Sequence, residues 1–187
     1  MKKIGFLGGT FDPIHKGHLE AAKIAADHIG LDKVFLIPAG LPPHKEGEYR
    51  GSAVHRLNMV RLSEKYDSRF EACDYEITKE GKSFSYLTME HFKRLYPDAT
   101  LYFIIGDEAY GKIDTWRNPE RLKAAVTFAV CSRDKKEVLS DGVNISFAPI
   151  EISSTMIREK IRQGEPFCEY VTKEVYEYIK ENNLYKG

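Results

Sequence analysis

The sequence predicts an α/β fold, a doubly wound Rossmann-like parallel sheet with helices on both faces. Short apolar runs rich in β-branched and aromatic residues, such as LYFII at 101–105 and VTFAVC at 126–131, are typical of buried central strands. Helical patterns of about ten residues or more separate these runs, and Pro97 ends one of them. Strands that alternate with helices of this length indicate βαβ units and therefore a parallel sheet.

The predicted elements follow one another in a regular order. Strands are predicted at 4–7, 33–38, 70–77, 101–105, 126–131 and 145–148. Helices are predicted at 19–28, 53–66, 83–96, 153–162 and 172–181. The start of the first helix stays open, because Asp12 and Pro13 could form its cap and first residue and Gly17 could equally begin it. No repeat or linker divides the chain, so we expect one domain over residues 1–187.

Composition and charge are typical of a globular protein without a strong electrostatic field. Apolar residues make up 42% and charged residues 30%, and 28 Lys and Arg balance 28 Asp and Glu. This balance disfavours nucleic acid and membrane surfaces as partners, and no apolar run approaches the roughly 20 residues of a membrane span. Cys73, Cys131 and Cys168 are far apart and odd in number, which suits a reducing cytosol. We expect a cytoplasmic protein; its oligomeric state, including a homo-oligomer, stays open.

A glycine-rich loop with two histidines follows the first predicted strand. Residues 8–18 read GGTFDPIHKGH. Gly8 and Gly9 allow backbone amides to approach an anion closely, and Thr10 adds a hydroxyl donor. Because a helix follows at the carboxyl edge of the sheet, its N-terminal amides and the positive end of its dipole add to the site. His15 and His18 lie within about a turn of each other beside this predicted phosphate site.

Two motifs resemble the signatures of the nucleotidyltransferase superfamily. The loop at 8–18 resembles its (H/T)xGH signature, and ISSTMIR at 152–158 resembles its second signature. The resemblance implies that ATP is bound by Gly8, Gly9, Thr10, Phe11, His15, His18, Gly106, Ser154, Thr155 and Arg158. It also implies that His18, His15 and Arg158 are catalytic. A protein metal site is not expected, because no cysteine or carboxylate stands at ligand spacing from the histidines and HEXXH is absent.

The middle of the chain resembles one family of that superfamily, the bacterial nicotinate-nucleotide adenylyltransferases. PPHK at 42–45, SFSYLT at 83–88 and Thr115-Trp116 match segments of that family in position. In the family, a hydroxyl and backbone amides of the second segment take the nicotinate carboxylate, and the tryptophan stacks on the ring. The resemblance implies contacts with nicotinate mononucleotide from His44, Lys45, Ser85, Asp107, Glu108, Trp116, Arg117 and Arg133.

Two positions depart from the family pattern. After the fourth strand the family has Gly, any residue and Asp, whereas Gly106 is followed here by Asp107 and Glu108. Either Glu108 fills the acidic position with one more methylene, or Asp107 fills it with a local shift. Ala39 and Gly40 stand where the family often has an asparagine before PPHK. Both departures concern the acceptor side of the expected site more than the ATP side.

The implied reaction transfers AMP from ATP to nicotinate mononucleotide and releases pyrophosphate, as a step of NAD biosynthesis. The acceptor phosphate has a second pKa of about 6 and is mostly dianionic at neutral pH, so no general base is required. The two histidines are therefore expected to stabilise charge, with Mg²⁺ bound through the ATP phosphates. The alternatives are an adenylyltransferase for nicotinamide mononucleotide or pantetheine phosphate, and a non-catalytic nucleotide-sensing domain.

Overall fold

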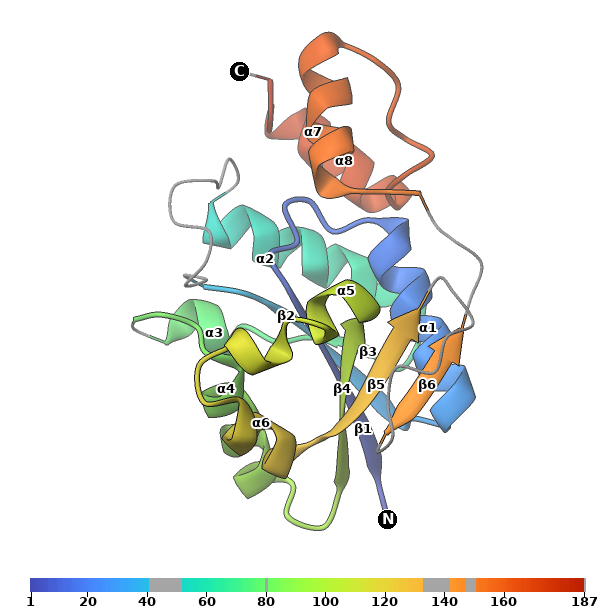
Figure 1. Cartoon of the computed structure of the whole chain (residues 1–187). Coiled ribbons are helices and arrows are strands. Elements are labelled where there is room, and N and C mark those ends of the chain that lie inside the picture. Colours follow the sequence, from blue (N-terminus) through green and yellow to red (C-terminus); the bar gives the residue numbers. More distant parts are fainter. Residues whose placement is uncertain (41–51, 80, 133–141, 147–150, 187) are drawn as a thin grey trace.

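A six-stranded sheet forms the centre of the computed structural model, which describes residues 1–40, 52–79, 81–132, 142–146 and 151–186 (Figure 1). The strands are β1 (Lys3–Gly9), β2 (Lys33–Pro38), β3 (Phe70–Ala72), β4 (Thr100–Gly106), β5 (Thr127–Ser132) and β6 (Val143–Ser146). All neighbours pair in parallel, in the order β3-β2-β1-β4-β5-β6. The predicted doubly wound parallel sheet is confirmed.

Helices cover both faces of the sheet because successive strand residues point to opposite sides. In β1, Leu7 packs in one hydrophobic cluster and its neighbour Phe6 packs in the other. The cluster of Leu7 includes buried residues of α1 (Lys16–Ile29), α2 (Ala53–Leu62), α7 (Ser154–Gln163) and α8 (Lys173–Glu181). The cluster of Phe6 includes buried residues of α4 (Ser85–Leu95) and α6 (Pro119–Ala125). Strands buried on both faces explain the near-continuous apolar runs of the sequence.

The two central strands define where a ligand can bind. β1 pairs with β2 on one side and with β4 on the other, and Leu7 lies opposite Ile104. The strand order reverses between β1 and β4, and ligands of such sheets bind at this switch point, at the carboxyl ends of the strands. β1 ends at Gly9 and β4 ends at Gly106, so the loops that follow both strands leave the sheet at the same edge.

The predicted strand at 70–77 is wrong in its second half. Only Phe70–Ala72 pairs with β2, and Tyr75–Thr78 forms the helical turn α3. The carbonyl of Asp74 accepts hydrogen bonds from the amides of Ile77 and Thr78, which turns the chain away from the sheet. Aromatic and β-branched residues favour a strand, but they do not reveal where its pairing partner ends.

The first helix begins at neither of the predicted starts. α1 starts at Lys16, and its N-cap is His15, with extended φ of −143° and ψ of 168°. The backbone amide of His15 donates a hydrogen bond to Nδ1 of His18 over 3.3 Å. The imidazole of His18, at the third helical position, thus accepts from the N-cap amide, a role that Glu or Gln fills in the usual capping box, and sequence rules for caps overlook it.

Other boundaries differ less from the predictions. The predicted helix at 53–66 is α2 followed by the 3-10 turn η1 (Ser63–Tyr66), and the helices at 83–96, 153–162 and 172–181 correspond to α4, α7 and α8. The strands at 4–7, 101–105, 126–131 and 145–148 correspond to β1, β4, β5 and β6, although residues 147–148 lie outside the described part. Three short elements were not predicted: α5 (Asp107–Tyr110), η2 (Ile113–Thr115) and α6.

The last two helices lie beyond the carboxyl ends of the strands. Figure 1 shows α7 and α8 above this edge of the sheet, next to α2 and to the loop that leads into α1. Both helices begin as helix-capping rules predict, since Ser153 and Thr172 accept hydrogen bonds from the amides of Met156 and Val175. No helix in the described residues is long and apolar enough to cross a membrane.

Candidate active site

A large open cavity lies at the switch point of the sheet. It has a volume of about 1020 Å³ and is walled by the loop after β1, by α5 and by the start of α7. Predicted site residues that line it are Thr10, Phe11, His15, His18, Gly106, Asp107, Glu108, Trp116, Ser154, Thr155 and Arg158. The structure therefore brings together the two sequence motifs, which are more than a hundred residues apart in the chain.

A second, smaller cavity adjoins the first. Its volume is about 460 Å³, and it lies between the end of β2, the start of α4 and the segment before α6. Gly8, Gly9, Ser85, Trp116 and Arg117 line it. Gly8 and Gly9 thus lie on the wall of the smaller cavity, whereas the sequence prediction places them beside the triphosphate.

Eight of the described residues belong to the walls of both cavities, and three of them carry polar or aromatic side chains that a ligand can meet. Thr10, His18 and Trp116 each line the larger and the smaller one. His18 leaves the first turn of α1, and the edge of its ring packs against Phe11, with ring centroids 5.1 Å apart. The buried Phe11 ring also explains why residue 9 is a glycine, because a Cβ at that position would lie 2.8 Å from the ring. The loop therefore fixes the imidazole of His18 at the junction.

The cap of α1 also defines which nitrogen of His18 carries a proton. An amide can only donate, so the bond from the amide of His15 requires a lone pair on Nδ1 of His18. This hydrogen bond assigns the proton to Nε2. His18 can consequently offer an Nε2–H donor to an anionic ligand while remaining neutral. The geometry therefore favours His18 as an N–H donor.

His15 lies beneath His18 and is almost fully buried, with 5% of its surface exposed. The two imidazole rings stack with centroids 3.6 Å apart and an angle of 22° between their planes. Burial lowers the pKa of His15 from 6.5 to about 4, so this ring is neutral at pH 7. The role that fits His15 is therefore the support and orientation of His18, rather than that of a second positive charge.

The second motif opens α7, whose first turn lines the larger cavity next to the loop after β1. The Arg158 guanidinium donates through Nη1 to the carbonyl of Asp12 over 2.7 Å and through Nη2 to Oγ1 of Thr155 over 3.2 Å. The hydroxyl of Ser154 donates to the carbonyl of Pro13 over 2.9 Å. These bonds fix the start of α7 against the loop after β1.

Two helix N-termini converge on the larger cavity. Gly17 and His18 of α1 line it, and so do Ser154 and Thr155 of α7. Neither helix has an acidic residue in its first turn, so no side chain there offsets the partial positive charge of the N-terminal amides. Together with Arg158, the two helices make this wall complementary to a polyanion.

The smaller cavity is more apolar and is built around the start of α4. The amides of Leu87 and Thr88 both donate to the carbonyl of Phe84, whereas helix geometry leaves the amides of Ser85 and Tyr86 without an intrahelical partner. No acidic residue lies in this first turn. The N-terminus of α4 therefore suits the carboxylate of a small ligand in the cavity.

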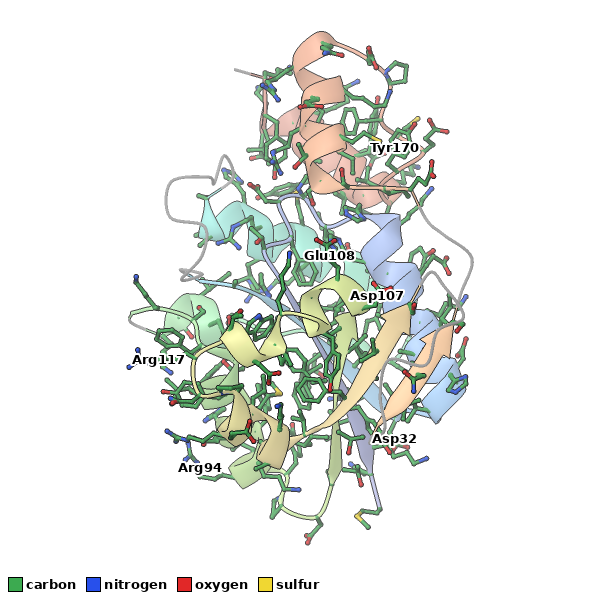
Figure 2. The ribbon with its side chains drawn as sticks, viewed as in Figure 1. Asp32, Arg94, Asp107, Glu108, Arg117 and Tyr170 are labelled. Carbon is green, nitrogen blue, oxygen red and sulfur yellow. The ribbon has the colours of Figure 1, made fainter. Side chains whose placement is uncertain are left out.

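Trp116 and Arg117 complete the wall of the smaller cavity opposite α4. Trp116 is half-buried, and its ring meets the ring of Phe103 edge to face, with centroids 6.3 Å apart. Arg117 is exposed. Figure 2 shows it well apart from Asp107 and Glu108, which lie at α5. A half-buried indole at this place suits stacking with a flat ring.

Asp107 and Glu108 differ in how they are held. Asp107 accepts hydrogen bonds from the amide of Glu108 over 2.8 Å and from the hydroxyl of Ser132 over 3.0 Å. Glu108 is exposed and forms only a 3.4 Å surface pair with Lys112 among the described residues. The better-ordered carboxylate is thus that of Asp107. Both line the larger cavity, so their predicted contact with the acceptor stays a prediction.

Some predicted residues lie outside the described part, and some described residues were not predicted. His44, Lys45 and Arg133 fall in segments that the structure does not describe. Four buried or half-buried polar residues around the cavities were not predicted as site residues: Asp12, Arg56, Glu76 and Tyr185. Each contacts residues distant in the sequence; Asp12 stands in the loop motif, where it was expected only as a possible helix cap, and no local motif marks the other three.

Arg56 is the largest fully buried polar side chain among them. It donates to the carbonyl of Thr10 over 2.7 Å and to the carbonyl of Gly40 over 3.2 Å. Gly40 also approaches the backbone of Glu76 so closely that a Cβ would lie 2.0 Å from its carbonyl oxygen. Arg56 thus ties the loop after β1 to the loop after β2, one on each side of the junction.

Comparison with known proteins agrees with this arrangement. The family model described as Cytidylyltransferase-like matches residues 6–160. A Clostridium tetani protein named "Probable nicotinate-nucleotide adenylyltransferase" is 38% identical, with 100% of both chains covered. Proteins of the same name from Shouchella clausii and Clostridium botulinum are 38% and 40% identical and cover 99% and 100% of this chain and 97% and 99% of their own. The chain belongs to the nicotinate-nucleotide adenylyltransferase family. The resemblance seen in the sequence motifs is therefore confirmed.

Solved structures show the same fold at lower identity. The Plasmodium falciparum nicotinic acid mononucleotide adenylyltransferase complexed with NaAD superposes with a TM-score of 0.84 at 20% identity, covering 99% of this chain and 98% of that one. The same protein complexed with APC gives a TM-score of 0.79 at 20% identity, with the same coverage. At this identity the likeness shows the fold alone, over nearly the whole length of both chains.

Proposed function

We propose that this chain transfers AMP from ATP to nicotinate mononucleotide, which yields nicotinate adenine dinucleotide and pyrophosphate in NAD biosynthesis. The single observation that carries this proposal is the junction of the two cavities, where Thr10 and His18 line both walls. A group transfer between two substrates needs their reacting atoms to meet, and adjoining cavities with a shared wall provide that place.

ATP fits the larger cavity. The amides of Ser154 and Thr155, with Arg158, would hold the β- and γ-phosphates at the start of α7. The Nε2–H of His18 would donate to the α-phosphoryl group, where negative charge builds up as the new bond forms. His15, neutral and stacked below, keeps that ring in place.

Nicotinate mononucleotide fits the smaller cavity. The nicotinate ring would stack on Trp116, and its carboxylate would lie at the amides of Ser85 and Tyr86. The hydroxyl of Thr88 donates to Glu76 over 2.7 Å, so the Ser85 hydroxyl is the better donor to the ligand. The contacts that the family resemblance implies for His44, Lys45, Arg117 and Arg133 belong to the same proposal.

The chemistry needs positioning and charge neutralisation more than proton transfer. An oxygen of the acceptor phosphate attacks the α-phosphorus, the bond from that phosphorus to the bridging oxygen breaks, and pyrophosphate leaves. The phosphate nucleophile is already dianionic near neutral pH, so no base has to remove a proton. His18 and Arg158 therefore stabilise the negative charge of the phosphates. We propose that they do so with ATP in one cavity and the mononucleotide in the other.

A divalent ion would join the site as part of the nucleotide. In the described residues, no three His, Cys, Asp or Glu side chains come together in a group that could hold a metal. A hard ion such as Mg²⁺ binds phosphate oxygens and water without a protein cage, so this site fits an ion carried by ATP, which would supply charge neutralisation. We also propose that residues 1–187 form one domain and that the protein works in the reducing cytoplasm, where its free Cys131 stays a thiol.

A pyrophosphate-release assay with ATP and three acceptors tests the proposal. Nicotinate mononucleotide, nicotinamide mononucleotide and pantetheine phosphate are compared at equal concentrations. We expect pyrophosphate release with the acid and a strong preference over the amide, because the α4 N-terminus and Arg117 favour an anion. A preference for either other acceptor would assign the chain to a sister activity. ATP binding without pyrophosphate release for any acceptor would indicate a nucleotide-sensing domain.

A further inference from the structure

The segment from α7 onward holds the loop after β1 at several points. Four hydrogen bonds join the two: Arg158 Nη1 to the carbonyl of Asp12 (2.7 Å), Ser154 Oγ to the carbonyl of Pro13 (2.9 Å), the amide of Lys16 to the carbonyl of Tyr170 (2.8 Å), and Tyr185 Oη to Oδ1 of Asp12 (2.7 Å). Figure 2 shows Tyr170 in the connection between α7 and α8, above the sheet. The loop that meets the triphosphate is therefore shaped from the far end of the chain.

Asp12 is the residue at which two of these bonds meet. Its carbonyl accepts from Arg158, and its carboxylate accepts from the Tyr185 hydroxyl. Asp12 is 3% exposed and Tyr185 is 5% exposed, so solvent does not replace either partner. Burial and the neighbouring Asp12 carboxylate raise the pKa of Tyr185, which keeps the phenol protonated as a donor.

The carboxylate of Asp12 poses a problem for a site that binds a polyanion. Asp12 lines the larger cavity together with Arg158 and Thr155, so a carboxylate turned into the cavity would repel phosphates and compete for the guanidinium. The bond to Tyr185 directs this carboxylate toward the segment after α8. Arg158 donates to the carbonyl of Asp12, which is a neutral acceptor, and so keeps its charge for the ligand.

We propose that Tyr185 is a positioning residue for ATP, which acts through Asp12 on the loop and on Arg158. The inference rests on the proposed function in one respect, because it takes the larger cavity as the ATP site. It predicts that loss of a single hydroxyl, far along the chain from the loop, weakens binding of ATP and leaves binding of the acceptor mononucleotide unchanged.

The test compares Tyr185→Phe with a matched control, Tyr178→Phe. The Tyr178 hydroxyl is 2.8 Å from Nδ1 of His55 and accepts from Asn58 over 2.9 Å, so it joins α8 to α2 and is none of the four bonds to the loop. Both variants lose one hydrogen-bonded phenol hydroxyl from the same end of the chain. For Tyr185→Phe we expect the KM for ATP to rise about tenfold, as for the loss of a hydrogen bond to a charged group, with the KM for nicotinate mononucleotide within twofold. Tyr178→Phe should leave both KM values within about twofold.

Titration with a non-hydrolysable ATP analogue separates this inference from the proposed function. If the wild-type protein releases no pyrophosphate, the proposed function fails, and the analogue affinities of the two variants still test Tyr185. If the wild type is active and Tyr185→Phe binds the analogue as Tyr178→Phe does, only the role of Tyr185 is overturned.

A second variant keeps the test decisive if Tyr185→Phe does not fold. Asp12→Ala removes the same hydrogen bond from the other side and also removes a negative charge from the cavity wall. Positioning by Tyr185 predicts that the KM for ATP rises despite the lost charge. Simple electrostatic repulsion predicts that it falls, and that result would overturn the inference.

Discussion

The two cavities are built in different ways. The wall of the larger one is assembled from residues far apart in the chain, since Arg158 reaches Asp12 and Arg56 reaches Thr10. The smaller one shares part of this wall with the larger, and its own side includes one local stretch of chain, from α3 to the start of α4, that faces Trp116 and Arg117. Charge and hydrogen bonds dominate the first, and an apolar ring platform with one helix N-terminus dominates the second.

This difference predicts how mutations should affect the binding and turnover of the two substrates. A polyanion needs several donors held in fixed positions, so changes at the larger cavity should affect turnover and ATP binding steeply. A flat ring gains mainly from stacking and apolar burial, so changes at the smaller cavity should affect acceptor binding more gently.

His18→Ala should give the largest loss, because His18 lies at the junction and serves the reacting phosphate. By analogy with the loss of one oxyanion donor, kcat should fall by roughly 10²-fold, with little change in folding. Steady-state pyrophosphate release and a thermal melt measure the two quantities. His28→Ala, at the exposed end of the same helix, is the control. Near wild-type turnover of folded His18→Ala would contradict the assigned role.

Arg158→Ala should act on ATP far more than on the acceptor. Loss of a charge-assisted contact with the far phosphates should raise the KM for ATP about 30-fold, because hydrogen bonds to charged groups contribute about 1.5–3 kcal/mol. The control is Arg162→Ala, one turn later on α7 and exposed. An equal rise in the KM for the acceptor and the KM for ATP would contradict the binding of the two substrates in separate cavities.

The buried His15 predicts a pH dependence of stability. Its pKa is about 4 when folded and 6.5 in the reference state, so between these values the unfolded chain binds a proton that the folded protein does not. Stability from this site is therefore complete above pH 6.5 and is lost as the pH falls toward 4. Between pH 7 and pH 5 the loss should be about 2 kcal/mol.

Urea unfolding at pH 7 and pH 5 measures this loss. His15→Gln should show a smaller fall in the free energy of unfolding than the wild type, because glutamine does not titrate. His28→Gln, which changes an exposed histidine of the same helix, should follow the wild type. An identical pH dependence in His15→Gln and the wild type would show that burial of His15 does not exclude its proton.

Trp116→Ala should have the smallest effect, and it tests acceptor binding in the smaller cavity. Loss of the stacking platform should raise the KM for nicotinate mononucleotide roughly tenfold and leave that for ATP near its wild-type value. Trp116→Phe keeps an aromatic ring and should recover part of the loss. Because Trp116 lines both cavities, equal effects on the two KM values would count against ring stacking.

Features with local signals could be predicted from the sequence, and contacts between distant residues could not. The sheet, its helices and the two motifs around His18 and Arg158 have local signals: apolar periodicity, glycines after a strand and a hydroxyl cap. Arg56 and Tyr185 have none, because their partners lie 46 and 173 residues away and only the fold brings them together.

Because residues 70–77 were predicted as one strand, a residue of the cavity wall was not predicted. Glu76 stands in that stretch, and a strand assignment gives no reason to place it at a cavity. In the structure it belongs to α3, lines the smaller cavity and accepts a hydrogen bond from Thr88. Burial raises the pKa of its carboxyl. The helical turn that sequence patterns missed thus places this carboxylate in the wall of the smaller cavity.

A crystal structure with nicotinate adenine dinucleotide tests the central claim, the division of the two substrates between two adjoining cavities, most directly. The account predicts that the nicotinate ring stacks on Trp116 with its carboxylate at the amides of Ser85 and Tyr86, while the adenylate lies in the larger cavity with its phosphate at His18. A nicotinate ring beside Arg158, with the adenine against α4, would contradict it.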